Sequence, residues 1–517
     1  MTSGIHHITL LTRKVQANVD FYAGFLGLRL VKRTGGYEDA EQLHLFYGDS
    51  EGSPGSLLTF FAWEDGSPGR VGLEQVGEIA LAVPPSSIGF WLTRALHYNV
   101  RHQGPSAEFG EPVLRLTDPD GIVVKLVGAA IEGGAPPWSA HGIDEANAVR
   151  RIRGATLFTD VPDQTSAFLT TYFGYRHLAN AGAIERLVSQ SGDVIDVRDA
   201  TGFWPGAPGT GVADHVAFRT PDRDQLEVVE RALRARNSSI VNVHDRKYYY
   251  SMYVRAPGNI LFELATDGPG LTVDETLETL GSRLMIPPER QAKAEAIKVM
   301  LPQFSMPDED RIRYADLPFV HRFHTPPDPD GSTIVLLHGS AGSEADLMPM
   351  AARIAPRATL VGVRGRATEE GIARWFRRDG PLGFDQDDIR SEARAFEAFV
   401  EGMLEAYGID PARTTFLGYS NGANFLLAAM QFHPGLVRSA IALRPATVLA
   451  EKTDADLSGS RVLVVLGRDD ALFHHQGDEV FADLTRLGAD TALAEVPLGH
   501  ELGDADIEVA GRWLAQD

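Results

Sequence analysis

The chain contains an internal repeat, and this repeat constrains its fold more than any other feature. The segment IHHITLLT, which begins at Ile5, aligns with IRGATLFT, which begins at Ile152, at an offset of 147 residues (152 − 5). At the same offset, FYAGFLGLRL from Phe21 falls on FLTTYFGYRH from Phe168. In both copies an apolar run precedes a helical stretch that ends at a glycine. We therefore expect a duplicated unit of a strand, a helix and further strands.

A second pattern closes these units. DPDGIVVKL from Asp118 resembles APGNILFEL from Ala256, and SPGSLLTFF from Ser53 is a looser copy. Each segment combines a Pro-Gly or Pro-Asp-Gly turn with an apolar strand. The sequence therefore predicts four βαβββ modules, at about residues 1–70, 75–130, 150–200 and 210–268.

The pattern changes after about residue 270. LGSRLMIPPERQAKAEAIKVMLP predicts a pair of helices interrupted by Pro287 and Pro288, and HTPPDPDGS is a Pro-rich linker. The later apolar runs, such as TIVLLHG and RVLVVLG, are continuous and are separated by helical stretches. This is typical of a mostly parallel, doubly wound sheet covered by helices on both faces. We predict two domains of two consecutive modules each, the second with a helical extension, then a linker and the parallel-sheet domain: 1–140, 141–305, 306–330 and 331–517.

The composition narrows the chemistry. The 517 residues include no cysteine, which excludes disulfides, thiolate metal sites and cysteine nucleophiles. The net charge of −22 argues against nucleic acid or anionic membranes as main partners. The chain shows neither a signal peptide nor an apolar run of about 18 residues that would span a membrane. We expect a cytoplasmic enzyme whose metal ligands are His, Asp or Glu and whose nucleophile is serine.

A comparison of equivalent module positions singles out three candidate metal ligands. The first strand carries His7 in module one and His215 in module four, and the last strand of module four carries Glu263. Two histidines and one carboxylate leave positions on Fe(II) open for a substrate and O₂. We therefore predict an Fe(II) site, with Mn(II) as a possible alternative. The other modules carry non-matching residues at these positions: Glu78, Gly154, Lys125 and Phe60.

Two further residues, His6 and Asp196, bear on this candidate metal site. His6 precedes His7, and the alternation of a strand sends its side chain to the opposite face unless the strand contains a bulge, so we expect His6 to be a packing or surface residue. Asp196, in GDVIDV, is a possible further carboxylate whose register the sequence does not fix. The alternative for the strand histidines is that they are satisfied within a core.

The N-terminal 305 residues resemble a known family. The stretches HHITLLT, FYAGFLGLRLVKRT, DHVAF, DRKYYYSMYVRAPGNILFELATD and LGSRLMIPP resemble hydroquinone ring-cleaving dioxygenases of the vicinal oxygen chelate superfamily. The resemblance implies the same three metal ligands. It also implies that Tyr253 lies near the substrate, with Arg246 and His244 as further candidates for binding it. A histidine often precedes the module-four ligand in this family, whereas Asp214 stands here and leaves an acid–base role at that position open.

The segment FLGYSNGANF predicts a serine nucleophile. Two glycines flank Ser420 between an apolar strand and an apolar helix, which is the context of a nucleophile elbow. The segments VLVVLGRDDALF and VPLGHELG follow and supply Asp469 or Asp470 and then His500. The order Ser, Asp, His matches a catalytic triad of this type.

The backbone N–H groups of Ser340 and Asn421 are candidates for an oxyanion hole. The stretches HGSAGSEADLMPMA, RGRATEEGIARWFRRDGPLGFDQDDI and GYSNGANFLLA resemble the phospholipase/carboxylesterase branch of the α/β-hydrolases, in particular small hydrolases associated with hydroquinone-responsive dioxygenases. The resemblance favours Asp470 over Asp469 as the triad acid. The segment RWFRR holds cations that either bind an acidic substrate or form a solvated helix face: Arg374, Arg377 and Arg378.

Together these features predict a bifunctional enzyme. An Fe(II)-dependent extradiol-type dioxygenase opens a hydroquinone-like 1,4-diol with O₂, and a serine hydrolase acts on the product or on a related ester or acyl species. The expected partners are a small aromatic diol and O₂, without nucleic acid or membrane, and a homo-oligomer is possible. The alternatives are a glyoxalase-like isomerase or an aromatic-binding module, fused to a general carboxylesterase or a C–C hydrolase.

Overall fold

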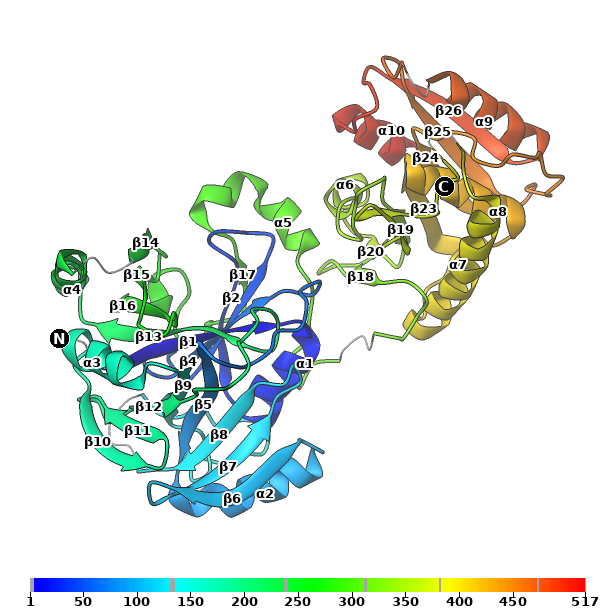
Figure 1. The fold of residues 1–517 in the computed structure, drawn as a ribbon. Coiled ribbons are helices and arrows are strands. Elements are labelled where there is room, and N and C mark those ends of the chain that lie inside the picture. Colours follow the sequence, from blue (N-terminus) through cyan, green and yellow to red (C-terminus); the bar gives the residue numbers. More distant parts are fainter. Residues whose placement is uncertain are drawn as a thin grey trace. The chain divides into compact units, whose positions relative to one another are not determined.

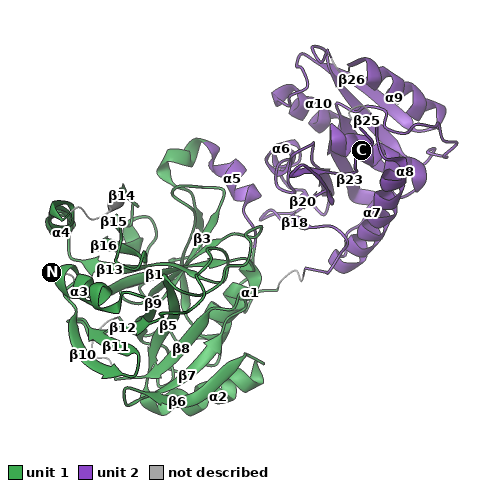
Figure 2. Ribbon diagram, viewed as in Figure 1, with its two compact units in different colours: residues 1–292, 304–311 green, residues 293–303, 312–517 purple. Residues whose placement is uncertain are grey.

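The computed structural model describes residues 4–130, 135–236, 240–310, 314–380, 383–471 and 474–516. The chain forms two compact units (Figure 2). Unit 1 comprises residues 1–292 and 304–311, and unit 2 comprises residues 293–303 and 312–517. Among the described helices, none is long and apolar enough to cross a membrane.

Unit 1 contains four modules, each with one strand, a helix and three further strands (Figure 1). Module one comprises β1 (Ile5–Thr12), α1 (Val15–Val19) with the π-helix Asp20–Phe25, β2 (Arg29–Gly35), β3 (Leu43–Gly48) and β4 (Leu57–Ala62). Module two comprises β5 (Gln75–Val83), α2 (Ile88–His97), β6 (His102–Glu108), β7 (Glu111–Thr117) and β8 (Val123–Gly128). Module three comprises β9 (Arg151–Thr159), α3 (Pro162–Tyr172), β10 (Arg176–Ala181), β11 (Ile184–Val188) and β12 (Val194–Asp199). Module four comprises β13 (Ala213–Thr220), α4 (Arg223–Ala235), β14 (Ile240–Asp245), β15 (Tyr249–Arg255) and β16 (Leu261–Pro269). The predicted βαβββ architecture is confirmed.

The modules pair in a way that sequence order does not reveal. Modules one and four form one sheet, in the order β14-β15-β16-β13-β1-β4-β3-β2-β17. Modules two and three form the other, in the order β10-β11-β12-β9-β5-β8-β7-β6. Each sheet is joined at its centre by antiparallel first strands, β1 with β13 and β5 with β9. The sheets thus pair module one with module four and module two with module three, whereas the predicted domains 1–140 and 141–305 each contain two consecutive modules. The predicted domain boundaries themselves remain a prediction.

The segment after module four differs from the predicted pair of helices. Leu284 and Met285 form a short strand, β17 (Leu284–Met285), which pairs in parallel with β2. Pro287 and Pro288 follow it, and the chain then forms a 3₁₀ turn and α5 (Ala294–Met300). The first predicted helix is therefore wrong, because the unpaired edge of β2 offers backbone partners that the local pattern does not reveal.

Unit 2 is a seven-stranded sheet with helices on both faces (Figure 1). Its strand order is β18 (His321–His324), β20 (Thr359–Val363), β19 (Thr333–Leu337), β23 (Thr414–Tyr419), β24 (Ser439–Leu443), β25 (Arg461–Gly467) and β26 (Asp490–Val496). All neighbouring strands are parallel except β18 and β20. The described α-helices of this unit are α5, α6 (Met348–Ile354), α7 (Gln386–Tyr407), α8 (Asn421–Phe432), α9 (His474–Arg486) and α10 (Asp504–Leu514).

The inner strands of the unit 2 sheet are buried on both faces. On β19, Val335 and Leu337 belong to the core that contains residues of α7, α8 and α9, whereas Ile334 and Leu336 belong to the core with α6 and α10. Successive strand residues point to opposite faces, so a strand covered on both sides needs a continuous apolar run. The predicted doubly wound sheet is confirmed.

Candidate functional site

Three candidate metal ligands converge in the sheet of modules one and four. His7 lies on β1, His215 on β13 and Glu263 on β16, and all three side chains are buried. Nε2 of His7 lies 3.3 Å and Nε2 of His215 2.7 Å from Oε2 of Glu263. One potential ligand atom from each residue lies within 4.8 Å of the others. These residues meet because β1, β13 and β16 are neighbours in the sheet.

The donor set fits a divalent metal. Nε2 of His215 and Oε2 of Glu263 are buried, and neither has a hydrogen-bond partner in the part of the chain that the structure describes. These two atoms lie 2.7 Å apart and face each other, and a divalent ion bound between them would supply each with a ligand bond in the buried site. Two histidines and one carboxylate leave further coordination positions for a substrate.

Polar contacts orient His215 and Glu263 through the atoms that do not face the other candidate ligands. Nδ1 of His215 lies 2.6 Å from Oδ2 of Asp214, and the hydroxyl of Ser251 donates to Oε1 of Glu263. Such contacts fix the orientation of the side chains that bind a metal. Burial would lower the pKa of His215, but Asp214 and Glu263 raise it to about 9. Burial would raise the pKa of Glu263, but the nearby His7 and His215 hold it well below its usual value.

His6 supports the site through an irregularity in β1. The β1–β13 register shifts between Ile5 and His7, so the simple alternation does not hold at His6. Nδ1 of His6 lies 2.9 Å from Nδ1 of His7, and its ring centroid lies 5.0 Å from that of Tyr249. Burial holds the pKa of His6 well below its usual value, so the ring is neutral. We expected His6 to be a packing or surface residue outside the site, because nothing in the local pattern predicts the bulge that brings it beside His7.

The residues at the corresponding positions of the other modules explain why the described parts of those modules contain no second His-His-Glu cluster. Strand pairing places Thr59, Lys125 and Asp196 where Glu263 stands in module four. The comparison with Phe60 is therefore one residue out of register. In module one, the hydroxyl of Thr59 lies 3.0 Å from that of Thr9 instead of offering a carboxylate.

In the sheet of modules two and three, an ammonium group stands among the carboxylates. Nζ of Lys125 is buried and lies 3.2 Å from Oε2 of Glu78 and 3.8 Å from Oδ2 of Asp196. Asp196 also accepts two hydrogen bonds from Arg186. The positive side chains neutralise these acids, so Asp196 is a member of an ion-pair network and not of the metal cluster.

A narrow cavity adjoins the metal cluster and is lined mainly by aromatic side chains. His7 and His215 line it together with Tyr253, whose ring centroid lies 5.3 Å from that of His215. Arg246 also lines the cavity and donates to Oη of Tyr253 (3.3 Å) and to Glu38 (2.9 Å). Burial raises the pKa of Tyr253 well above its usual value, so the phenol stays protonated.

The third candidate for substrate binding, His244, lies further out. Its Nε2 lies 3.7 Å from Oε1 of Glu38, and its ring centroid lies 6.3 Å from that of Tyr253. Glu38 thus contacts both His244 and Arg246. His244 is at the rim of this aromatic cluster and not against the metal ligands.

The triad candidates of unit 2 lie within hydrogen-bond distance of one another. Nε2 of His500 lies 3.0 Å from Oγ of Ser420, and Nδ1 of His500 lies 2.8 Å from Oδ2 of Asp470. Asp469 instead donates its backbone N–H to the carbonyl of Leu498. Ser420 has φ 49° and ψ −115° between β23 and α8, a strained conformation that exposes a nucleophile at a sharp turn.

Two residues that the sequence did not single out hold the loop of His500. Arg444 is fully buried, forms a 2.8 Å ion pair with Asp506 and donates to the carbonyl of Gly499. The hydroxyl of Tyr419 donates to the carbonyl of His500 (3.0 Å). No local motif marks these contacts, because they join the ends of three different strands.

The oxyanion-hole candidates flank the nucleophile. Asn421 begins α8 directly after Ser420, and its Oδ1 accepts a hydrogen bond from the backbone of Trp375. A Cβ added at Gly339 would lie 3.7 Å from Cβ of Ser420, so the loop that carries Ser340 runs beside the elbow.

The three arginines of RWFRR differ in their surroundings. Arg374 donates to Oγ of Ser340 (3.0 Å) and lies 3.1 Å from Glu369. Arg378 also pairs with Glu369, whereas Arg377 pairs with Asp388. Arg374 is thus the member of the set that contacts the oxyanion-hole loop. It ends β22 (Ile372–Arg374), which pairs with β21 (Ala367–Glu369) rather than forming a helix face.

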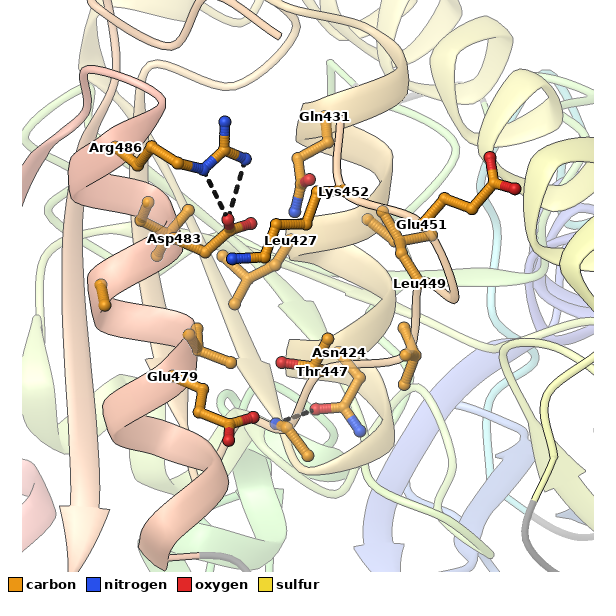
Figure 3. Close-up of a pocket in the computed structure, with 16 residues that line it drawn as sticks. Asn424, Leu427, Gln431, Thr447, Leu449, Glu451, Lys452, Glu479, Asp483 and Arg486 are labelled. Atoms are coloured by element: carbon orange, nitrogen blue, oxygen red, sulfur yellow. Dashed lines mark hydrogen bonds and ion pairs between the residues drawn. The ribbon is translucent and has the colours of Figure 1, made fainter. Parts of the chain in front are cut away.

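Unit 2 also contains a larger cavity, of about 550 Å³, between α8, α9 and the loop after β24 (Figure 3). Asn424, Leu427 and Gln431 line it from α8, and Lys452 extends into it from the loop. None of the triad residues is among its described lining residues.

The fold and the two sites define an oxidoreductase unit of the vicinal oxygen chelate type joined to an α/β-hydrolase unit. Residues 4–126 match the family model of the Glyoxalase/Bleomycin resistance protein/Dioxygenase superfamily. The chain is 36% identical over 312 residues, which are 60% of this chain and 99% of the relative, to the Bacillus subtilis protein named "Putative ring-cleaving dioxygenase MhqO". It is 30% identical over 313 residues, 57% of this chain and 95% of the relative, to "Chlorohydroquinone/hydroquinone 1,2-dioxygenase" of Sphingobium indicum.

A solved structure and a second group of relatives agree with this division. A crystal structure of a dioxygenase-like protein from Bacillus subtilis matches 60% of this chain and 99% of its own length, with 34% identity and a TM-score of 0.57. The Bacillus subtilis protein named "Putative hydrolase MhqD" is 30% identical over 186 residues, 36% of this chain and 93% of the relative. The chain therefore belongs to the family of ring-cleaving dioxygenases and carries a hydrolase unit in addition.

Proposed function

We propose that unit 1 is an Fe(II)-dependent dioxygenase that cleaves the ring of a hydroquinone-like 1,4-diol, with Mn(II) as a possible alternative ion. The main support is the convergence of His7, His215 and Glu263 beside an aromatic-lined cavity. This donor set is typical of iron oxygenases that bind both a substrate and O₂. One relative is named for a hydroquinone substrate, which favours a 1,4-diol here as well.

The chain's own residues would prepare the substrate. When bound, the ion lowers the pKa of a phenol and supplies the redox chemistry that O₂ requires. Arg246 places a positive charge beside the cavity and so favours an anionic diol. Tyr253, held by Arg246 and protonated, donates a hydrogen bond to substrate oxygen. We assign Tyr253 as a catalytic residue and Arg246 and His244 to substrate binding.

The alternatives for unit 1 fit less well. An aromatic-binding module without a metal has no use for a buried His-His-Glu set whose potential ligand atoms converge on one point. A glyoxalase-like isomerase usually needs a fourth protein ligand. The position equivalent to Glu263 in module one is Thr59, whose hydroxyl contacts Thr9.

For unit 2, we propose a serine hydrolase with Ser420 as nucleophile, His500 as general base and Asp470 as its partner. The supporting observation is the pair of contacts, 3.0 Å and 2.8 Å, that His500 makes with Ser420 and Asp470. The N–H groups of Ser340 and Asn421 would bind the oxyanion. We propose that the substrate is the ring-opened product of unit 1 or a related ester or acyl compound. Ring opening of a diol by O₂ leaves a carboxylate, and Arg374 beside Ser340 suits such a group.

One experiment tests both units together. The full chain is loaded anaerobically with Fe(II) or Mn(II), mixed with hydroquinone or catechol, and oxygen uptake and products are measured. Uptake that depends on the metal and on hydroquinone supports the proposal for unit 1, and no uptake with either diol would overturn it. Ser420→Ala should leave uptake unchanged and accumulate the ring-opened compound. If wild type and variant give the same end product, the two activities are not coupled.

A further inference from the structure

Two polar groups outside the metal cluster line the metal-side cavity without a hydrogen-bond partner among the described residues. His44, on β3, is 8% exposed and lines this cavity, and its Nε2 makes no hydrogen bond in the described part of the chain. The hydroxyl of Tyr37, which also lines the cavity, is buried and likewise unpaired there. Neither residue belongs to the metal cluster, and the sequence motifs did not point to either. A buried group of this kind is costly unless a ligand completes it.

The ring of His44 is fixed in place by its neighbours. It stacks on Phe61, with ring centroids 4.0 Å apart and an angle of 24° between the planes, and lies 4.2 Å from the ring of Phe46. The side chain therefore cannot turn away without losing these contacts. Burial, together with the positive charge of Arg246 nearby, holds the pKa of His44 well below its usual value. A neutral imidazole has one N–H and one lone pair, so it can either donate to or accept from a hydroxyl.

We propose that His44 and Tyr37 bind the distal hydroxyl of the diol and thereby select 1,4-diols over catechols. This inference rests on the proposed function of unit 1.

The position of β3 in the sheet supports this assignment. His7 and His215 line the cavity from β1 and β13, whereas His44 lines it from β3, with β4 between β3 and β1. With a spacing of about 4.8 Å between strands, β3 lies about 10 Å from β1 along the sheet. The two hydroxyls of a 1,4-diol lie at opposite ends of the ring, so one can reach the metal ligands while the other faces β3. In a catechol both hydroxyls lie at the same end, and His44 and Tyr37 would stay unpaired.

A binding experiment on the full chain tests this proposal without turnover. The protein is loaded with Fe(II) under argon and titrated calorimetrically with hydroquinone, with catechol and with phenol, which lacks the distal hydroxyl. His44→Phe keeps the aromatic ring between Phe46 and Phe61, and Tyr37→Phe removes a single oxygen. Each variant should weaken hydroquinone about fivefold, as expected for one lost hydrogen bond, and should change phenol and catechol less than twofold.

Tyr248→Phe is a matched control. Tyr248 lines the same cavity, but its hydroxyl already donates to Asp274 at 3.0 Å. Removing that oxygen should leave the relative affinities for the three ligands unchanged. Circular dichroism and the bound-iron content check that each variant is folded and loaded with iron. If His44→Phe does not fold or does not bind iron, Tyr37→Phe alone tests the proposal.

The outcomes separate this inference from the proposed function. If the wild-type protein binds neither hydroquinone nor phenol, the proposed function of unit 1 fails. If it binds both, and the two variants weaken hydroquinone and phenol equally or not at all, the dioxygenase proposal stands and the distal-hydroxyl site is overturned.

Discussion

Oδ2 of Asp214 lies 2.6 Å from Nδ1 of His215, so a carboxylate supports this imidazole from the adjacent position in the sequence. A carboxylate at Nδ1 favours the tautomer that leaves the lone pair of Nε2 directed at the metal cluster. Asp214 thus has a polar supporting role for His215.

We expect Asp214→Asn to weaken metal binding about 10- to 100-fold, because an amide orients and polarises the imidazole less well. Competition with a coloured chelator measures the affinity. Asp224→Asn, an exposed change in the first turn of α4, is the control and should have no effect. An unchanged affinity in Asp214→Asn would show that other contacts suffice to orient His215.

Removing the metal should destabilise unit 1 alone. An ion at 100 times its dissociation constant stabilises the folded state by about 2.7 kcal/mol. A chelator should therefore lower the transition temperature of unit 1 in a calorimetric scan of the full chain and leave that of unit 2 unchanged. In the Glu263→Gln variant, unit 1 should unfold at the lowered temperature whether or not the chelator is present. If the chelator does not change the transition temperature of unit 1 in the wild type, the metal site is contradicted.

The neighbouring acids Asp469 and Asp470 should behave differently. Asp470→Asn should lower kcat for p-nitrophenyl acetate about 10⁴-fold, because His500 loses the partner that fixes its tautomer. Asp469→Asn, which keeps the backbone contact to Leu498, should stay within a few-fold of wild type. Equal losses in both variants would remove Asp470 from the triad.

The buried pair of Arg444 and Asp506 should be important for the hydrolase fold. Arg444→Met alone leaves the carboxylate of Asp506 buried without its ion partner, which costs about 3–5 kcal/mol. The double variant Arg444→Met/Asp506→Leu removes both charges and should recover a large part of that stability. Urea denaturation followed through unit 2 measures both. No recovery in the double variant would show that the bonds from Arg444 to the His500 loop matter more than the charge pair.

The metal-free protein should lose stability below about pH 6.5. Burial lowers the pKa values of His6, His7 and His44, so the unfolded chain binds more protons than the folded one in this range. Each such group reduces the free energy of unfolding by about 1.4 kcal/mol for each pH unit below 6.5 until its folded pKa is reached. The slope is measured by urea denaturation of the chelated protein at pH 6.5 and 5.5. His44→Phe should reduce it by one proton, and an unchanged slope would contradict the buried neutral state of His44.

The sequence was sufficient for the parts that depend on local patterns. The repeat from Ile5 and Ile152 predicted the modules, and the Gly-x-Ser-x-Gly segment around Ser420 predicted the elbow. Both work because the periodicity of apolar residues and the conformational freedom of glycine act over a few residues. The pair Asp469 and Asp470 was harder, since both side chains follow the same strand and only the position of His500 distinguishes them.

The candidate ligands and nucleophile were thus identified from the sequence: two histidines and a glutamate at matching places in repeated modules, and a serine between two glycines. The tertiary structure decided what surrounds them. It joined module one to module four, shifted the register at His6, placed Asp196 with Lys125 in the other sheet, and turned His44 and Tyr37 into the cavity. The physical reason is that strand pairing and bulges depend on contacts between distant segments, and such contacts leave no periodic trace in either segment alone.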